Sequence, residues 1–185
     1  LHVSLRAIAA RKWLAMADMY TEIPIALNVR RGKDFEDASD ESEFYSRGPL
    51  RTPLSWFIRT LQEIRSRLGV PRAPAYVVSD GTEQDLEPLL RINDVHLVES
   101  RSAISDLLIL AKARLLIGSG GSSFSAWASF LGQMPTVSHP GQSLNWFKVS
   151  GDSSAHYVGE YLVGDENAEF FSHPSVASLP QRVRV

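Results

Sequence analysis

Short apolar segments alternate with amphipathic segments along most of this chain, and this alternation constrains the fold more than any other feature. Apolar runs that predict buried strands begin at Ile25, Ala75, Val95, Arg114 and Pro135. A helix-like segment follows each of the first four before the next run begins. Parallel strands need crossover connections, and helices are the usual ones. The pattern therefore predicts an α/β, Rossmann-like three-layer fold with a parallel sheet.

The helix with the clearest ends is predicted over residues 52–69, "TPLSWFIRTLQEIRSRLG". Thr52 is a suitable capping residue, Pro53 suits the first helical position, and Gly69 ends the segment. Its apolar residues recur at helical spacing, so one face is expected to pack against the sheet.

The length of 185 residues suits one domain with its own core. We therefore predict a single Rossmann-like domain over residues 1–185. A leading amphipathic helix is expected within residues 1–20, and the pattern is weak in the C-terminal segment, residues 140–185. Because the chain starts at Leu1 without an initiator methionine, we expect the natural N-terminus to lie further upstream.

Composition excludes several classes of protein. A formal net charge of -2 argues against a general nucleic-acid binder, which needs a basic excess. No cysteine is present, so disulfides and thiolate metal sites are excluded. The longest apolar candidate is interrupted by Lys112 and Arg114, and no membrane-spanning segment is expected. The absence of cysteine and of a signal-peptide pattern slightly favours a cytoplasmic location.

Three segments place unusual residues where predicted strands end. They are "NVRRGKD" at 28–34, "SDGTE" at 79–83 and "GSGGSSFS" at 118–125. In an open parallel sheet, ligands bind beyond the carboxyl ends of the strands. We therefore expect these three segments to form one site.

The arginine pair in the first segment suits a diphosphate, because each guanidinium can donate two parallel hydrogen bonds to phosphate oxygens. Arg30 and Arg31 alternate along the strand, so we expect only one of them to point directly at a ligand. The alternative is that both pair with the acidic loop that follows, which has six carboxylates within residues 34–43. A divalent ion in that loop is a further alternative, but mobile carboxylates are usually solvated, and we predict no metal site.

The turn at 118–125 offers backbone N–H groups and the start of a helix near Ser122, which together favour an anion. The alternative is a tight turn in which glycines allow close packing. It is neither a P-loop nor a dinucleotide-binding fingerprint, and no serine lies in a G-x-S-x-G elbow.

Read in order, "LNVRRGKDF", "AYVVSDGTEQDL" and "SDLLILAKARLLIGSGGSSFSAWASFLG" resemble successive motifs of the fucosyltransferase superfamily that includes α1,2-, α1,6- and protein O-fucosyltransferases. The resemblance covers about residues 25–132. It implies a GT-B architecture, of which this chain is the C-terminal, nucleotide-sugar-binding half. It differs from the family pattern at three points: Asn28 replaces a histidine, Lys33 is inserted, and Gly81 replaces an aspartate.

The resemblance also implies roles for individual residues. Arg30 would hold the β-phosphate of the donor with help from Arg31, Asp106 would contact the base, and Ser122 would touch the diphosphate. The full set of donor-binding residues that it implies is Asn28, Arg30, Arg31, Asp80, Asp106, Ser122, Ser123 and Phe124. The catalytic residues would be Arg30, together with Glu36 or Asp37 as the general base.

The reaction that the resemblance implies is inverting transfer of fucose from GDP-fucose to a glycan hydroxyl, with no metal or other cofactor. The expected partners are therefore a nucleotide sugar and a glycan acceptor, and a missing N-terminal domain would shape the acceptor site. Two alternatives stay open: a non-catalytic nucleotide- or glycan-binding module, and a transferase that uses another nucleotide sugar.

Overall fold

A six-stranded, all-parallel sheet forms the centre of the protein. The structure is a computed structural model that describes residues 9–47, 50–99, 102–142 and 156–180, together with Ser4 and Ala7. The strands are β1 Ile23–Val29, β2 Ala75–Ser79, β3 Val95–Leu97, β4 Ala113–Gly118, β5 Thr136–Ser138 and β6 Val158–Glu160. The sheet confirms the predicted α/β Rossmann-like fold.

The strand order is β3-β2-β1-β4-β5-β6. The chain builds outward from β1 to β3 on one side, then returns and builds from β4 to β6 on the other. At the boundary between β1 and β4, consecutive connections leave in opposite directions, and such a switch point opens a crevice at the carboxyl ends of the strands. The fold therefore marks one place on the sheet edge as the natural position for a ligand.

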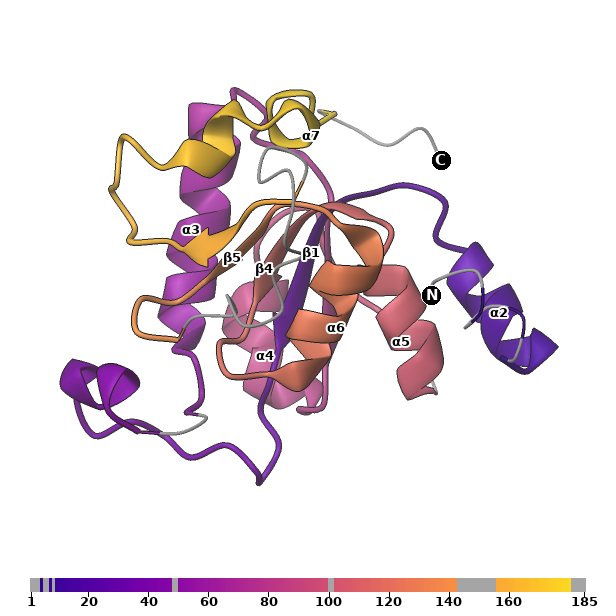
Figure 1. Cartoon of the computed structure of the whole chain (residues 1–185), viewed down its shortest axis with the longest axis horizontal. Helices are drawn as coiled ribbons and strands as arrows, with labels where there is room; N and C mark the ends of the chain where they lie inside the picture. The colour runs from indigo at the N-terminus through magenta and orange to yellow at the C-terminus, as the bar shows by residue number, and fades with distance from the viewer. Residues whose placement is uncertain are drawn as a thin grey trace.

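Helices cover both faces of the sheet. Figure 1 shows α5 and α6 on one side, α3 and α4 on the other, and α2 at the edge of the molecule. The described helices are α2 Arg11–Asp18, η1 Glu41–Tyr45, α3 Leu54–Arg67, α4 Glu83–Leu90, α5 Ala103–Leu110, α6 Ser123–Gly132, η3 Glu169–Ser172 and α7 Pro174–Ala177. None of the helices within the described ranges is long and apolar enough to cross a membrane.

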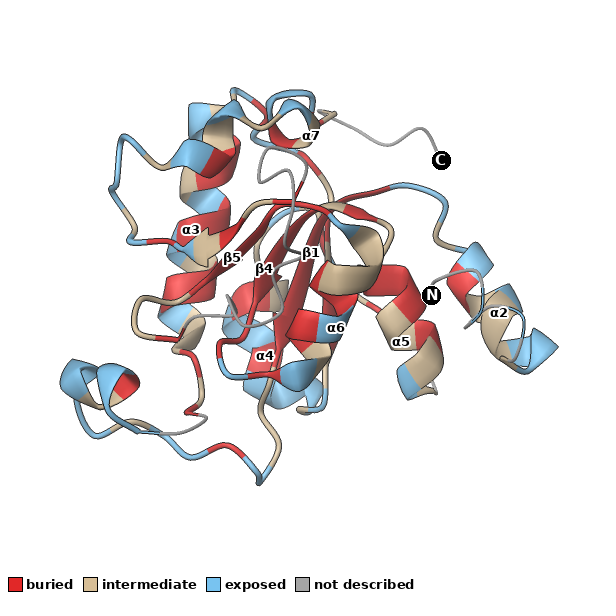
Figure 2. Cartoon of the chain, viewed as in Figure 1, coloured by how far each residue is buried: buried red, intermediate tan, exposed pale blue. Residues whose placement is uncertain are grey.

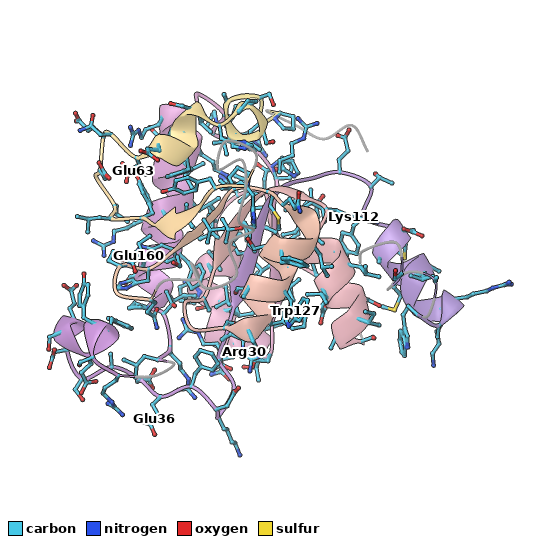
Figure 3. The ribbon with its side chains drawn as sticks, viewed as in Figure 1. Arg30, Glu36, Glu63, Lys112, Trp127 and Glu160 are labelled. Carbon is cyan, nitrogen blue, oxygen red and sulfur yellow. The ribbon has the colours of Figure 1, made fainter. Side chains whose placement is uncertain are left out.

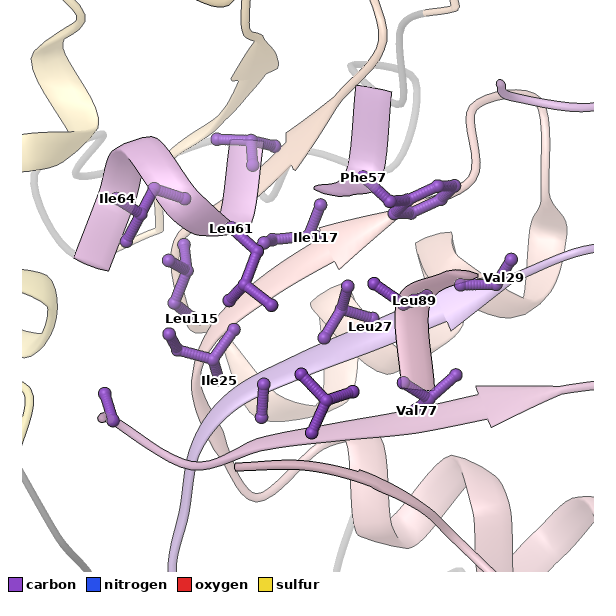
Figure 4. Close-up of a cluster of buried hydrophobic side chains, with 14 of the residues drawn as sticks. Ile25, Leu27, Val29, Phe57, Leu61, Ile64, Val77, Leu89, Leu115 and Ile117 are labelled. Atoms are coloured by element: carbon purple, nitrogen blue, oxygen red, sulfur yellow. The ribbon is translucent and has the colours of Figure 1, made fainter. Parts of the chain in front are cut away.

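The strand β1 is buried along its whole length, which explains why all of its residues except Asn28 are apolar. Ile25, Leu27 and Val29 face the core with α3 and α4, whereas Ala26 faces the core with α5. Figure 2 shows the central strands buried throughout, and Figure 4 shows how side chains of α3 interlock with those of β1 and β4. Two apolar layers therefore fix the directions of successive side chains on β1.

One local prediction was wrong. The side chain of Thr52 does not cap α3, for which Pro53 is the capping residue; instead, the Thr52 hydroxyl donates to Gln142 Oε1 at 2.8 Å. A partner 90 residues away in the sequence thus takes the hydrogen bond that the local backbone would have used. A leading helix does lie within residues 1–20, as α2 at Arg11–Asp18.

The segment after β6 packs against α3, although its sequence pattern is weak. The Trp56 indole N–H donates to the Tyr161 carbonyl at 3.1 Å, and Gly164 N–H donates to Glu63 at 2.9 Å. The Arg67 guanidinium lies 3.9 Å from the ring centre of Phe171. These contacts attach the residues that follow β6, including Phe171 of η3, to α3.

Candidate functional site

The carboxyl ends of β1 and β4 are joined through Ser119, directly at the switch point. Its backbone N–H donates to the Asn28 carbonyl at 2.9 Å, and its hydroxyl accepts from the Arg30 backbone N–H at 2.9 Å. Ser119 is fully buried. This one residue therefore fixes the start of the arginine segment relative to the serine/glycine turn, which lies 89 residues further along the chain.

The Arg30 guanidinium lies at this edge of the sheet (Figure 3) and contacts two carboxylates through one nitrogen. Its Nη2 is 2.7 Å from Asp34 Oδ2 and 3.1 Å from Asp80 Oδ2. Its Nε is buried and has no hydrogen-bond acceptor among the described residues. A guanidinium can bind a phosphate with two parallel N–H groups through Nε and Nη2, or through Nη1 and Nη2. Both pairs include Nη2, which the two carboxylates already occupy, so one carboxylate must move away before a phosphate can bind in this way. Asp34 is the more exposed of the two.

Asp80 organises the arginine segment from the end of β2. Its second oxygen, Oδ1, accepts from the Arg31 backbone N–H at 2.7 Å. A Cβ on Gly32 would crowd the ends of the Asp80 and Asp34 side chains, so a larger residue at this position would require both carboxylates to shift. Asp80, in the second predicted segment, thus contacts both Arg30 and Arg31 in the first. The structure therefore brings these two predicted segments together.

The turn after β4 leads directly into α6. Ser122 is the N-cap of α6, and its side chain accepts from the Ser125 N–H at 3.3 Å. Ser123 is exposed at the first helical position, and Phe124 is half-buried against the core. Gly121 has a φ of +66°, a conformation that favours glycine. The helix N-terminus, with its partial positive charge, therefore lies beside the switch point.

The side chain of Asn28 is directed into the protein. It is 2% exposed, and its Nδ2 donates to the Ser125 hydroxyl at 2.7 Å. This bond ties β1 to α6 beneath the turn. Asn28 thus has a structural role, because it holds the start of α6 against the end of β1.

Arg31 lies two residues beyond the end of β1, next to the loop that leads into α3. There it lines a cavity with Asp37 and Arg51, and Asp37 Oδ2 is 2.9 Å from Arg51 Nη1. Glu36 instead pairs with Arg47. Both residues belong to the loop that carries η1, the outlying loop, and Figure 3 labels Glu36 there. Of the two carboxylates predicted as a general base, only Asp37 lines this cavity.

Asp106 lies in the first turn of α5, on the α2 side of the sheet. Burial raises the pKa of Tyr20, and the charge of Asp106 adds to the shift. Its predicted contact with a nucleotide base stays a prediction. Among the described residues, no three His, Asp or Glu side chains come together as a metal site.

Two residues of the site were not singled out from the sequence. Ser119 lay within a segment that was identified, but only the sheet order reveals its bonds to both neighbouring strands. Arg51 lies just before α3, and its position next to a predicted helix cap was the only available signal.

Comparisons with known proteins find solved structures that are similar to this chain. No family model matches the sequence, and a search of curated proteins finds no match. Two crystal structures of POFUT1 in complex with GDP are similar to this chain. They are protein O-fucosyltransferase structures. One has 16% identity over 70% of this chain with a TM-score of 0.48, and the other has 15% identity over 84% with a TM-score of 0.44. This chain covers 46% and 48% of their lengths, so it spans about half of each.

Proposed function

We propose that this chain is the nucleotide-sugar-binding part of a fucosyltransferase-like glycosyltransferase. The observation that carries the proposal is the arrangement at the switch point: Arg30 at the end of β1 and the N-terminus of α6 after β4 meet there, joined by Ser119. A guanidinium and a helix N-terminus are both suited to a diphosphate. The motif resemblance to fucosyltransferases then favours GDP-fucose as the donor.

The proposed reaction is a single displacement that inverts the anomeric carbon. The oxygen of an acceptor hydroxyl bonds to the anomeric carbon of fucose, the bond from that carbon to the β-phosphate oxygen breaks, and GDP leaves with the electron pair. Arg30 and the N–H groups of α6 stabilise the charge that develops on the leaving group, a task that needs no metal ion. Asp37 accepts the proton of the hydroxyl as a general base.

The remaining predicted donor contacts are part of this proposal. Ser122 and Ser123 lie at the start of α6, with Phe124 next to them, and we assign them to the diphosphate. Asp106 is assigned to the base. A second, N-terminal domain outside this chain would complete the acceptor side.

A non-catalytic binding module is the second candidate. It is favoured by Asn28, which replaces the histidine of the family motif and is buried against Ser125 rather than open to a ligand. Formation of a fucosylated product from GDP-fucose and an acceptor would exclude this candidate.

Calorimetry with GDP tests the site directly. We expect Arg30→Ala to abolish GDP binding while circular dichroism shows the fold to be intact. Arg47→Ala is the matched control, because Arg47 pairs with Glu36 and Glu43 on the outlying loop. Tight GDP binding by the Arg30 variant would refute the assignment.

A thermal-shift panel of GDP-, UDP- and CMP-sugars tests the class of donor. A ligand that binds only the folded protein raises its melting temperature, so GDP-fucose should produce the largest shift. A larger shift with a UDP- or CMP-sugar would favour a transferase that uses another donor.

A further inference from the structure

A cavity of about 320 Å³ lies between the arginine segment that follows β1 and the residues that lead into α3. This volume is within the range of sites for small ligands. Its lining combines two guanidinium groups, three carboxylates and apolar surface. The residues are Arg31, Asp37, Ala38, Asp40, Glu41, Phe44, Arg51 and Pro53.

Arg31 differs from the neighbouring arginines in its charge balance. Arg30 contacts two carboxylates and Arg51 contacts Asp37, whereas Arg31 forms no ion pair within the described residues. The Nε atoms of both Arg31 and Arg51 are buried and find no acceptor in the described ranges. Burial lowers the pKa of Arg31 and the like charge of Arg51 acts in the same direction, whereas the carboxylates of Asp37, Asp85 and Asp80 oppose the shift. The cavity therefore includes one guanidinium group, that of Arg31, that is not paired with a carboxylate of the described residues.

The carboxylates lie closer to solvent than the guanidinium groups. The side chain of Asp37 is 74% exposed, against 26% for Arg51, and Asp40 and Glu41 are also exposed. Carboxylates accept hydrogen bonds from hydroxyl groups. The cavity thus offers positive charge at its base and hydrogen-bond acceptors at its rim.

We propose that this cavity binds an acidic sugar residue, whose carboxylate pairs with Arg31 and whose hydroxyls donate to the carboxylates at the rim. The inference rests on the proposed function: the acidic sugar would belong to the glycan acceptor. A planar carboxylate matches the two parallel N–H groups of a guanidinium. Because Asp37 lines the same rim, a hydroxyl of the bound saccharide would lie on the side of the proposed general base.

Calorimetry with digalacturonate, in the absence of GDP, tests the inference. The neutral dimethyl ester of digalacturonate keeps the rings and all of their hydroxyls but loses both charges. We expect the ester to bind about tenfold or more weakly, the effect of losing one charged hydrogen-bonded contact. Arg31→Gln and Arg51→Gln should each reduce digalacturonate affinity toward that of the ester, and Arg47→Gln should not.

The opposite outcomes are equally clear. Equal affinity for the acid and the ester, no binding of digalacturonate, or full binding of digalacturonate by Arg31→Gln would overturn the inference. Stronger binding of a sulfated disaccharide than of digalacturonate would replace the carboxylate by a sulfate. GDP binding by the unmodified protein is measured separately. Its failure would remove the proposed function, whereas failure of digalacturonate alone would remove only this inference.

Discussion

Replacing Gly120 by alanine should disrupt the turn after β4, although the backbone conformation there allows any residue. A Cβ at this position would overlap the Cβ and the carbonyl oxygen of Gln142, and its carbonyl carbon would be 3.0 Å away. Gln142 is buried, accepts from the Thr52 hydroxyl at 2.8 Å, and donates to the Leu50 carbonyl at 2.8 Å. The new methyl group must therefore displace backbone as well as a bonded side chain.

The expected loss of stability follows from these contacts. Overpacking costs about 1–3 kcal/mol, and two buried hydrogen bonds contribute about 1 kcal/mol each. The free energy of unfolding of Gly120→Ala should thus fall by about 3–5 kcal/mol. The control is Gly69→Ala, at φ +65° with no atom within 4 Å of the new Cβ, where only backbone strain of about 1–2 kcal/mol is expected.

Urea unfolding of both variants measures the difference, and calorimetry with GDP reports on the turn. Gly120→Ala should also lose GDP affinity, because the turn leads into the N-terminus of α6. If Gly120→Ala loses no more stability than Gly69→Ala, the close approach of Gln142 does not constrain the turn and the reasoning fails.

Three further predictions concern single charged groups. Asp34→Asn should bind GDP about two- to fivefold more tightly, because the carboxylate competes with phosphate for Arg30; weaker binding in calorimetry would contradict this. The buried Arg65 donates four hydrogen bonds to three backbone carbonyls, so Arg65→Met should lower the free energy of unfolding by about 3–5 kcal/mol in urea. The control Arg72→Met, at an exposed ion pair, should cost much less. Burial lowers the pKa of His139, so the unfolded chain takes up a proton that the folded protein resists. The free energy of unfolding should therefore fall as the pH decreases below about 6.5, and His139→Gln should fall less steeply, as measured by urea unfolding at several pH values.

The regular elements were largely predictable because their signals are local. The capping residue of α6 and the small-residue turn before it are readable from a few neighbouring positions, and the structure confirms a helix beginning beside Ser122. The strand β1 begins two residues earlier than predicted, at Ile23, because Pro24 is accommodated within the strand. Thr52 shows the limit of local reasoning, since its hydroxyl is used by Gln142.

The candidate site was predictable only in outline. The three segments that carry it were identified from residue type and from their positions after strands. Their relative placement depends on the order of strands in the sheet, which brings Arg30 and Ser119 together across 89 residues. The partner of each charge depends on the same long-range contacts, and for this reason the choice of Asp37 over Glu36 at the cavity required the structure.

By itself, the sequence determined the alternation of strands and helices, the parallel sheet and the location of the polar residues at one edge. The tertiary structure decided that Arg30 is bonded to Ser119 and contacts two carboxylates, while Arg31 lines a cavity and forms no ion pair with any described residue. The physical reason is that both arginines lie beyond the end of β1, where contacts with other segments and not strand geometry set their surroundings. Those segments are turns and loops that are distant in the sequence.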